Sequence, residues 1–139
     1  MSNNPIPQGN YRPAVRYHQF VYTAGMTPRK EGKLVLSGKI SSDEPIETYR
    51  PAVEQAASNV LAAVENTLEA GERIVQILSM TVYVNGGAEY TEHSKIGDIA
   101  TAYLVKQLGD IAIGARAVVG CASLPGNAPL EIQMVAAVE

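Results

Sequence analysis

The sequence predicts an α+β sandwich, in which two helices cover one face of a mixed β-sheet. Two long segments, residues 47–70 and 91–108, carry apolar side chains at helical spacing. Shorter segments rich in β-branched and aromatic residues precede, separate and follow them. Two helices can cover only one face of a sheet built from these strands. The sequence has no internal repeat and no low-complexity tract, so we expect one domain over residues 1–139.

Both helices have recognisable starts and stops. Pro51 suits the first turn, so the first helix is predicted to begin at residue 49 or 50, and Gly71 is the predicted stop after residue 70. Its apolar positions are Val53, Ala56, Ala57, Val60, Leu61, Val64 and Leu68. The second helix is predicted to begin at residue 91 or 92 and to end at Leu108, where Gly109 follows.

Strands are expected before, between and after the helices. Residues 15–24 are predicted to form a hairpin broken near His18, and residues 28–43 a loop with brief pairing around 34–36. A long strand is predicted over 74–84, with one face made of Val75, Ile77, Ser79, Thr81 and Tyr83. Because the strands are apolar on both faces, we expect a partner sheet on the face without helices.

Composition and charge exclude several classes of function. The net charge is −3 with no basic stripe, so neither nucleic acid nor an anionic membrane is an expected partner. The chain start shows no signal-peptide pattern, and no apolar run reaches the length of a membrane span, so we expect a cytoplasmic protein. Two distant histidines and one cysteine predict neither a metal site nor an internal disulfide. Phosphate-binding and dinucleotide-binding glycine motifs and a GxSxG elbow are also absent, so no cofactor is expected.

The last quarter of the chain carries the candidate chemistry. Two apolar strands flank a turn-rich loop at 123–129, and each strand holds one full charge, Arg116 in the first and Glu131 in the second. A charge in an apolar strand needs a partner, because its burial alone costs several kcal/mol, roughly. An edge-strand surface position or a structural ion pair would satisfy this need, and so would a ligand site.

The spacing of these residues resembles a known family. Arg116 is followed by Ser-Leu-Pro at 123–125 and by Glu131 six residues after the proline, and upstream stand Gly9-Asn-Tyr11, Phe20-Val-Tyr-Thr-Ala-Gly25 and Met80-Thr-Val-Tyr-Val-Asn85. This pattern resembles the RidA/YjgF family of reactive intermediate deaminases, in a divergent branch, and covers nearly the whole chain. The resemblance implies a chorismate-mutase-like fold and a homotrimer with pockets near the subunit boundaries.

The resemblance also implies roles for individual residues. Arg116 matches the arginine that holds a substrate carboxylate, and a guanidinium suits this role through its rigid fork of donors. Glu131 matches a carboxylate that activates water and returns the proton to the leaving amine. Tyr11 matches a tyrosine that lines the pocket. The backbone at Ala24 and Gly25 matches the segment that approaches the ligand, with Ala24 in place of a serine.

Two further positions depart from the family pattern. Val118 stands where the family often has a cysteine, and Cys121 is expected on the opposite strand face from Arg116, as a small buried hydrophobe. His93 stands in the region where the family often has an asparagine. It is either an exposed residue of the first helical turn or a group of the substrate pocket.

The activity that the resemblance implies is a cofactor-free hydrolysis of imine or enamine acids. Substrates of the 2-aminoacrylate type would be converted to keto acids and ammonia. Two alternatives stay open: a non-catalytic protein that binds a small carboxylate-bearing metabolite, and a pathway-specific deaminase of larger, aminomuconate-type enamines. A nuclease activity gains no support from an acidic chain without a basic patch.

Overall fold

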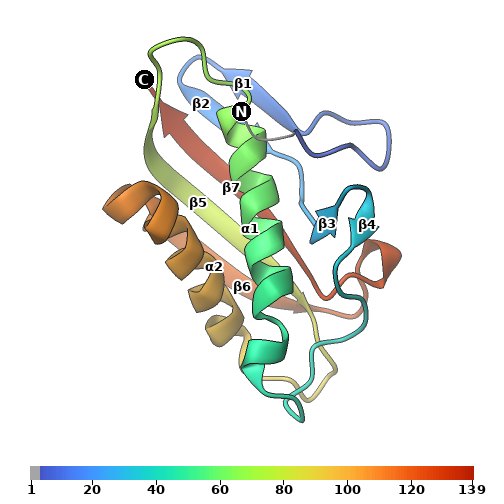
Figure 1. Ribbon diagram of the computed structural model, residues 1–139. Helices are drawn as coiled ribbons and strands as arrows, with labels where there is room; N and C mark the ends of the chain where they lie inside the picture. Colours follow the sequence, from blue (N-terminus) through green and yellow to red (C-terminus); the bar gives the residue numbers. More distant parts are fainter. Residues whose placement is uncertain (1–3) are drawn as a thin grey trace.

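A five-stranded sheet forms one layer of the molecule, and two helices form the other (Figure 1). The computed structural model describes residues 4–139. The strands lie in the order β1-β2-β7-β5-β6. Their bounds are Ala14–Tyr17 for β1, Phe20–Thr23 for β2, Ile74–Asn85 for β5, Ala115–Cys121 for β6 and Leu130–Val138 for β7.

The sheet is mixed, as predicted. Strands β5 and β6 are parallel, because helix α2 (His93–Leu108) connects them across the sheet, and the other neighbouring pairs are antiparallel. Helix α1 (Arg50–Glu65) crosses β7 and β2, and α2 lies over β6 and β5. Both helices therefore pack on the same face of the sheet, and this arrangement confirms the predicted fold class (Figure 1).

Helix α1 begins where Pro51 predicted but ends earlier than expected. Pro51 occupies the first turn, after the short 3₁₀ turn η1 (Ile46–Thr48). The last helical residue is Glu65 rather than residue 70. The Asn66 amide donates to the Ala62 carbonyl at 2.8 Å, and the Thr67 hydroxyl donates to the Val64 carbonyl at 2.7 Å. These side chains satisfy the terminal carbonyls, so the helix stops before Gly71.

Helix α2 agrees closely with its prediction. It ends at Leu108, and Gly109 follows with a positive φ of 78° and opens the 3₁₀ turn η2 (Gly109–Ala112). The buried residues of α2 are Ile96, Gly97, Ile99, Ala100 and Leu104.

The N-terminal hairpin and the segment after it also match expectation. Strands β1 and β2 pair directly, and His18 takes a positive φ of 55° at the break between them. The predicted loop over 28–43 contains a small second sheet, in which β3 (Arg29–Lys30) pairs with β4 (Lys33–Leu34). The paired residues lie slightly earlier than the predicted 34–36.

Strand β5 does not alternate regularly, and the predicted composition of its faces was wrong in one place. Register irregularities lie between Ile74 and Gln76 and between Ile77 and Ser79. Ile77 is therefore 1% exposed beneath the helices, whereas the neighbouring Leu78 is 37% exposed. A β-bulge inserts a residue without its ladder partner, so the side-chain alternation changes phase there.

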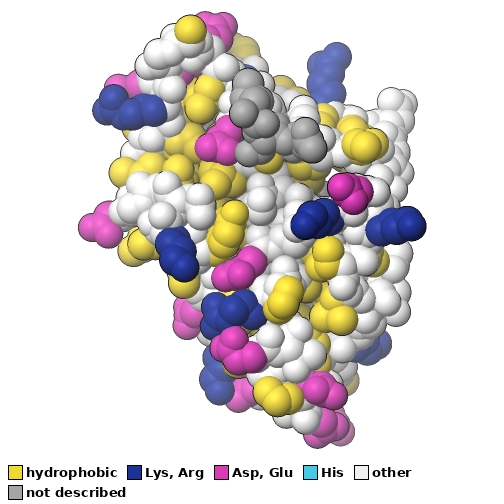
Figure 2. Space-filling model, in the orientation of Figure 1, with side chains coloured by type: hydrophobic (Ala, Val, Ile, Leu, Met, Phe, Trp, Pro, Cys, Tyr) yellow, Lys and Arg dark blue, Asp and Glu magenta, His cyan; other side chains and the backbone are white. Residues whose placement is uncertain are grey.

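The sheet face opposite the helices has no cover among residues 4–139. Strand β7 presents Leu130, Ile132, Met134, Ala136 and Val138 to the helices, and each is at most 1% exposed. On the other face, Val15, Tyr17, Phe20 and Tyr22 form two cross-strand pairs and are 45–69% exposed. Their exposure agrees with the expectation that both faces are apolar. On the opposite, helical side of the molecule, basic and acidic side chains are interspersed (Figure 2).

None of the helices in residues 4–139 is long and apolar enough to cross a membrane.

Candidate functional site

Arg116 lies on the edge strand β6 and points toward the helices. Its Nη1 donates to Asp98 Oδ1 at 2.9 Å and to Thr101 Oγ1 at 3.0 Å, and its Nη2 donates to Ser94 Oγ at 3.1 Å. The three partners form one stripe along α2, at positions i, i+4 and i+7. The side chain of Arg116 is 23% exposed, and that of Asp98 is 72% exposed. The sequence left open whether Arg116 occupies an edge strand or forms a structural ion pair. In the structure it does both.

Gly97 lets α2 approach β6 closely enough for these contacts. A Cβ at this position would lie 3.0 Å from Arg116 Cζ and 2.6 Å from Val118 Cγ2. Both distances are shorter than ordinary van der Waals contacts, so a larger residue would push the helix outward. Glycine inside a helix costs about 1 kcal/mol relative to alanine. An interior Gly97 beside a polar stripe was thus a usable signal that the sequence analysis missed.

Val118 and His93 belong to the same edge as Arg116. Val118 projects from the same face of β6 and packs against Gly97. His93 is the first residue of α2, and its ring meets the Tyr90 ring edge to face, at 5.3 Å between centroids. A Cβ at Gly120 would lie 2.7 Å from His93 Nε2. His93 is thus partly buried between Tyr90 and β6, not a fully exposed residue of the first turn.

Glu131 lies on the other face of the sheet. It follows Leu130 and precedes Ile132, both of which are completely buried beneath the helices. Its carboxylate abuts Gly25, where a Cβ would overlap it, so any larger residue at that position would displace the carboxylate. No hydrogen-bond donor contacts the carboxylate among residues 4–139. Desolvation by burial raises the pKa of the Glu131 carboxyl above its ordinary value.

Tyr11 and Gly25 line a separate cavity of about 510 Å³ on the helical side of the sheet edge. The Tyr11 hydroxyl accepts a hydrogen bond from the Gln8 backbone N–H at 3.0 Å. The backbone N–H of Ala24 donates to the Pro13 carbonyl at 2.8 Å, and the Ala24 side chain packs on the core. Gly25 connects the two features, since it faces the cavity and touches Glu131.

The predicted site residues therefore fall into two groups. Arg116, Val118 and His93 lie between α2 and β6, whereas Tyr11, Gly25 and Glu131 lie around the start of β7. Arg116 is in register with Met80 of β5, and Met80 is in register with Met134 of β7. Glu131 precedes Met134 by an odd number of residues, so its side chain points away from the helices. Within one chain, Arg116 and Glu131 do not share a pocket.

Cys121 lies on the face of β6 opposite to Arg116, as strand alternation predicted. It is partly exposed in the chain and not fully buried. Among the described residues, no three His, Cys, Asp or Glu side chains are placed to hold a metal ion together.

The overall fold is shared with proteins of known structure. The fold matches solved α+β proteins in which two helices pack on a mixed sheet. One is a protein of unknown function, Atu1372 from Agrobacterium tumefaciens, with a TM-score of 0.87 and 29% identity over 96% of this chain and 86% of the other. Another is the YjgF gene product of Escherichia coli, with a TM-score of 0.70 and 22% identity over 97% and 93% of the two chains.

The model of the family described as endoribonuclease L-PSP matches residues 1–138. The protein belongs to this family, which is the RidA/YjgF family that the sequence resembled. A curated relative, a RutC family protein of Aquifex aeolicus, is 29% identical over 133 residues, which are 95% of this chain and 91% of the relative.

Proposed function

We propose that the protein is a cofactor-free deaminase that hydrolyses imine or enamine acids of the 2-aminoacrylate type. The observation that carries the proposal is the state of Glu131, a half-buried carboxylate with a raised pKa beside the backbone of Gly25. A general base works best when its pKa lies nearer to the working pH than that of an ordinary carboxyl. Burial without a hydrogen-bonding partner supports that tuning in Glu131.

The chemistry needs only a positioned acid and a water. An enamine acid first becomes its imine, and Glu131 removes a proton from water as the oxygen attacks the imine carbon. The carboxyl then returns this proton to the nitrogen of the carbinolamine, and ammonia leaves as the hydroxyl proton passes to the carboxylate and the carbonyl of the keto acid forms. Arg116 would hold the substrate carboxylate through two parallel hydrogen bonds. The Tyr11 phenol, which lines the neighbouring cavity with Gly25, would be a further donor.

The separation of Arg116 from Glu131 favours a site between two copies of the chain. One copy would supply Glu131, Gly25 and Tyr11, and its neighbour would supply Arg116 and Val118, with His93 beside them. The proposed assembly is a homotrimer. The apolar residues on the uncovered sheet face support an assembly of this kind, because such a surface favours burial against a partner.

A second candidate is a carboxylate-binding protein without catalysis. One observation favours it: Ala24 offers no hydroxyl where the family often has a serine. A ribonuclease, which the family description suggests, has less support. The chain is acidic overall, and basic and acidic side chains are interspersed on the face in Figure 2, whereas RNA binding favours a basic patch.

The test is direct. A serine or threonine dehydratase generates the imine acid in the cuvette, and its decay is followed with and without the purified protein. We expect faster decay with stoichiometric release of keto acid and ammonia. If several imine acids decay at the buffer rate while pyruvate still binds through Arg116, the binding protein replaces the deaminase.

A further inference from the structure

The cavity beside the β3–β4 hairpin has a built cationic wall that the proposed reaction does not use. Its volume of about 510 Å³ lies within the range of small-molecule sites. Three separate segments enclose it: the N-terminal segment, the stretch from Gly25 to Gly32, and one face of α1 with Gln55, Ser58 and Asn59. Neither Arg116 nor Glu131 lines it.

The backbone that carries Arg29 is fixed to α1. The Asn59 amide donates to the Thr27 carbonyl at 3.0 Å and to the Arg29 carbonyl at 2.8 Å. Asn59 Oδ1 in turn accepts a hydrogen bond from Gln55 Nε2 at 2.9 Å. The backbone N–H of Arg29 donates to the Thr27 carbonyl at 2.8 Å. This wall of the cavity is therefore ordered without a ligand, which lowers the entropic cost of binding one.

The guanidinium of Arg29 is held but not neutralised. Its Nη1 donates to the Gly32 carbonyl at 3.1 Å. Its Nη2 rests on Gly126 of η3 (Pro125–Asn127), where a Cβ would lie 2.8 Å away. Within residues 4–139, no carboxylate forms an ion pair with Arg29, and its Nε is the one buried side-chain nitrogen or oxygen without a hydrogen-bond partner. Nη2 also has no hydrogen-bond partner among these residues but, unlike Nε, it is accessible to solvent, so a bound anion can accept its N–H groups.

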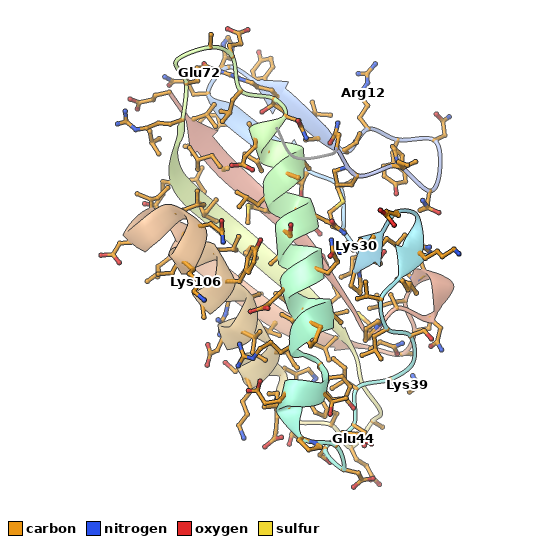
Figure 3. The ribbon with its side chains drawn as sticks, in the orientation of Figure 1. Arg12, Lys30, Lys39, Glu44, Glu72 and Lys106 are labelled. Atoms are coloured by element: carbon orange, nitrogen blue, oxygen red, sulfur yellow. The ribbon has the colours of Figure 1, made fainter. Side chains whose placement is uncertain are left out.

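The local charge favours an anion. Arg29 and Lys30 contribute two positive charges to the lining, and Glu31 contributes one negative charge. Figure 3 places Lys30 on β3 beside α1, and Figure 2 shows basic and acidic side chains gathered over this hairpin. A guanidinium remains charged at every physiological pH, so the positive wall is permanent.

We propose that this cavity binds a small organic oxyanion, a carboxylate or a phosphate ester, through Arg29. The Nη2 N–H groups of Arg29 would donate to the anion, and Lys30 would strengthen the attraction. The site is additional to the proposed deaminase site, although Tyr11 and Gly25 form part of both surroundings.

The experiment titrates the protein with citrate, malonate and ribose 5-phosphate at low ionic strength, where charged interactions are least screened. Affinity is measured by calorimetry, and the location by the amide NMR signals of Gly32 and Gly126. We expect saturable binding of at least one probe with shifts at both glycines. Whether the carboxylates or the phosphate bind more tightly identifies the source of the oxyanion.

Three variants decide the outcome. Arg29→Gln is expected to weaken binding at least about tenfold, because charge-assisted bonds are roughly twice as strong as neutral ones. Lys33→Gln removes the same charge from the exposed strand β4 outside the cavity, and should change affinity less than about twofold. Ser58→Leu narrows the cavity from α1 without touching Arg29, and should also abolish binding, which covers the case of a misfolded Arg29 variant.

The proposal is overturned if the wild type binds none of the probes saturably, or if Arg29→Gln and Ser58→Leu bind as tightly as wild type. If binding is lost only in Arg116→Gln, the anion occupies the edge between α2 and β6. That result refutes the Arg29 site and leaves the proposed deaminase intact. Conversely, a protein without imine turnover that still binds the probes through Arg29 retains this inference.

Discussion

Arg116 and Glu131 point to opposite faces of one sheet, although β6 and β7, which carry them, are consecutive strands in the sequence. Strand β5 lies between their strands, and the register through Met80 and Met134 sets the two side chains on different sides. A reaction that needs both groups must therefore combine them from two copies.

This relationship predicts complementation between inactive variants. Arg116→Gln and Glu131→Gln should each lose imine hydrolysis. When the two are unfolded together and refolded as an equal mixture, about one quarter of the wild-type activity should return, since that fraction of interfaces pairs an intact Glu131 with an intact Arg116. The measurement is the rate of imine decay in the mixture against each variant refolded alone. A mixture as inactive as its components would place the whole reaction within one chain.

The raised pKa of Glu131 predicts that this residue lowers the stability of the fold at neutral pH. In the folded chain its carboxyl is protonated more readily than in the unfolded chain, so the buried charge destabilises the fold above the raised pKa. Glu131→Gln should therefore increase the free energy of unfolding at pH 7, with a gain that shrinks as the pH falls through the raised pKa. Denaturant titrations at several pH values measure this, with the exposed Glu89→Gln as the matched control.

The protonation of Glu131 should also set how the reaction rate depends on pH. The base form of Glu131 is the carboxylate, so kcat/KM in wild type should rise with pH through that raised pKa and then level. A rate that is independent of pH across this range would argue against Glu131 as the base.

The pairing of Arg116 with Asp98 predicts that two conservative substitutions have opposite effects on pyruvate affinity. Arg116→Lys keeps the charge but loses the planar fork, so pyruvate affinity should fall roughly tenfold. Asp98→Asn removes the carboxylate that competes for the guanidinium, so pyruvate should bind severalfold more tightly. Asp110→Asn, an exposed change of the same charge near the end of α2, is the control. Equal affinities for wild type and Asp98→Asn would mean that the ligand does not use the Asp98 side of Arg116.

The helices, the hairpin and the terminal strand pair could be predicted because their signals are local. Periodic apolar residues, Pro51 and Gly109 determine where helices run, and alternation places Leu130, Ile132 and Met134 on one face. The end of α1 was misplaced because Asn66 and Thr67 terminate it through side-chain hydrogen bonds, and the residues after it still carry an apolar Leu68 that packs on the core.

The features that escaped prediction depend on contacts between distant segments. The bulges in β5 are set by its pairing with β7 and have no mark in the run from Ile74 to Ser79. The partners of Arg116 could not be named before α2 was placed over β6, although Gly97 hinted at close packing. The Arg29 cavity is formed by three separate chain segments, so no single sequence motif predicts it.

The last prediction concerns acid stability and the ion pair that joins the first hairpin to the loop after α1. Arg16 donates to both carboxylate oxygens of Glu72, at 2.5 and 2.6 Å, and this lowers the pKa of Glu72 to about 2. A carboxyl whose folded pKa lies below its unfolded value of 4.5 stabilises the fold above pH 4.5, and this contribution disappears as the pH falls toward 2. Glu72→Gln should therefore destabilise the protein at pH 7 and have progressively less effect between pH 4.5 and 2. Glu44, exposed at the opposite end of the molecule in Figure 3, offers the control Glu44→Gln, which should match wild type throughout. A loss in Glu72→Gln that is as large at pH 2 as at pH 7 would show that packing, not charge, makes this contact matter.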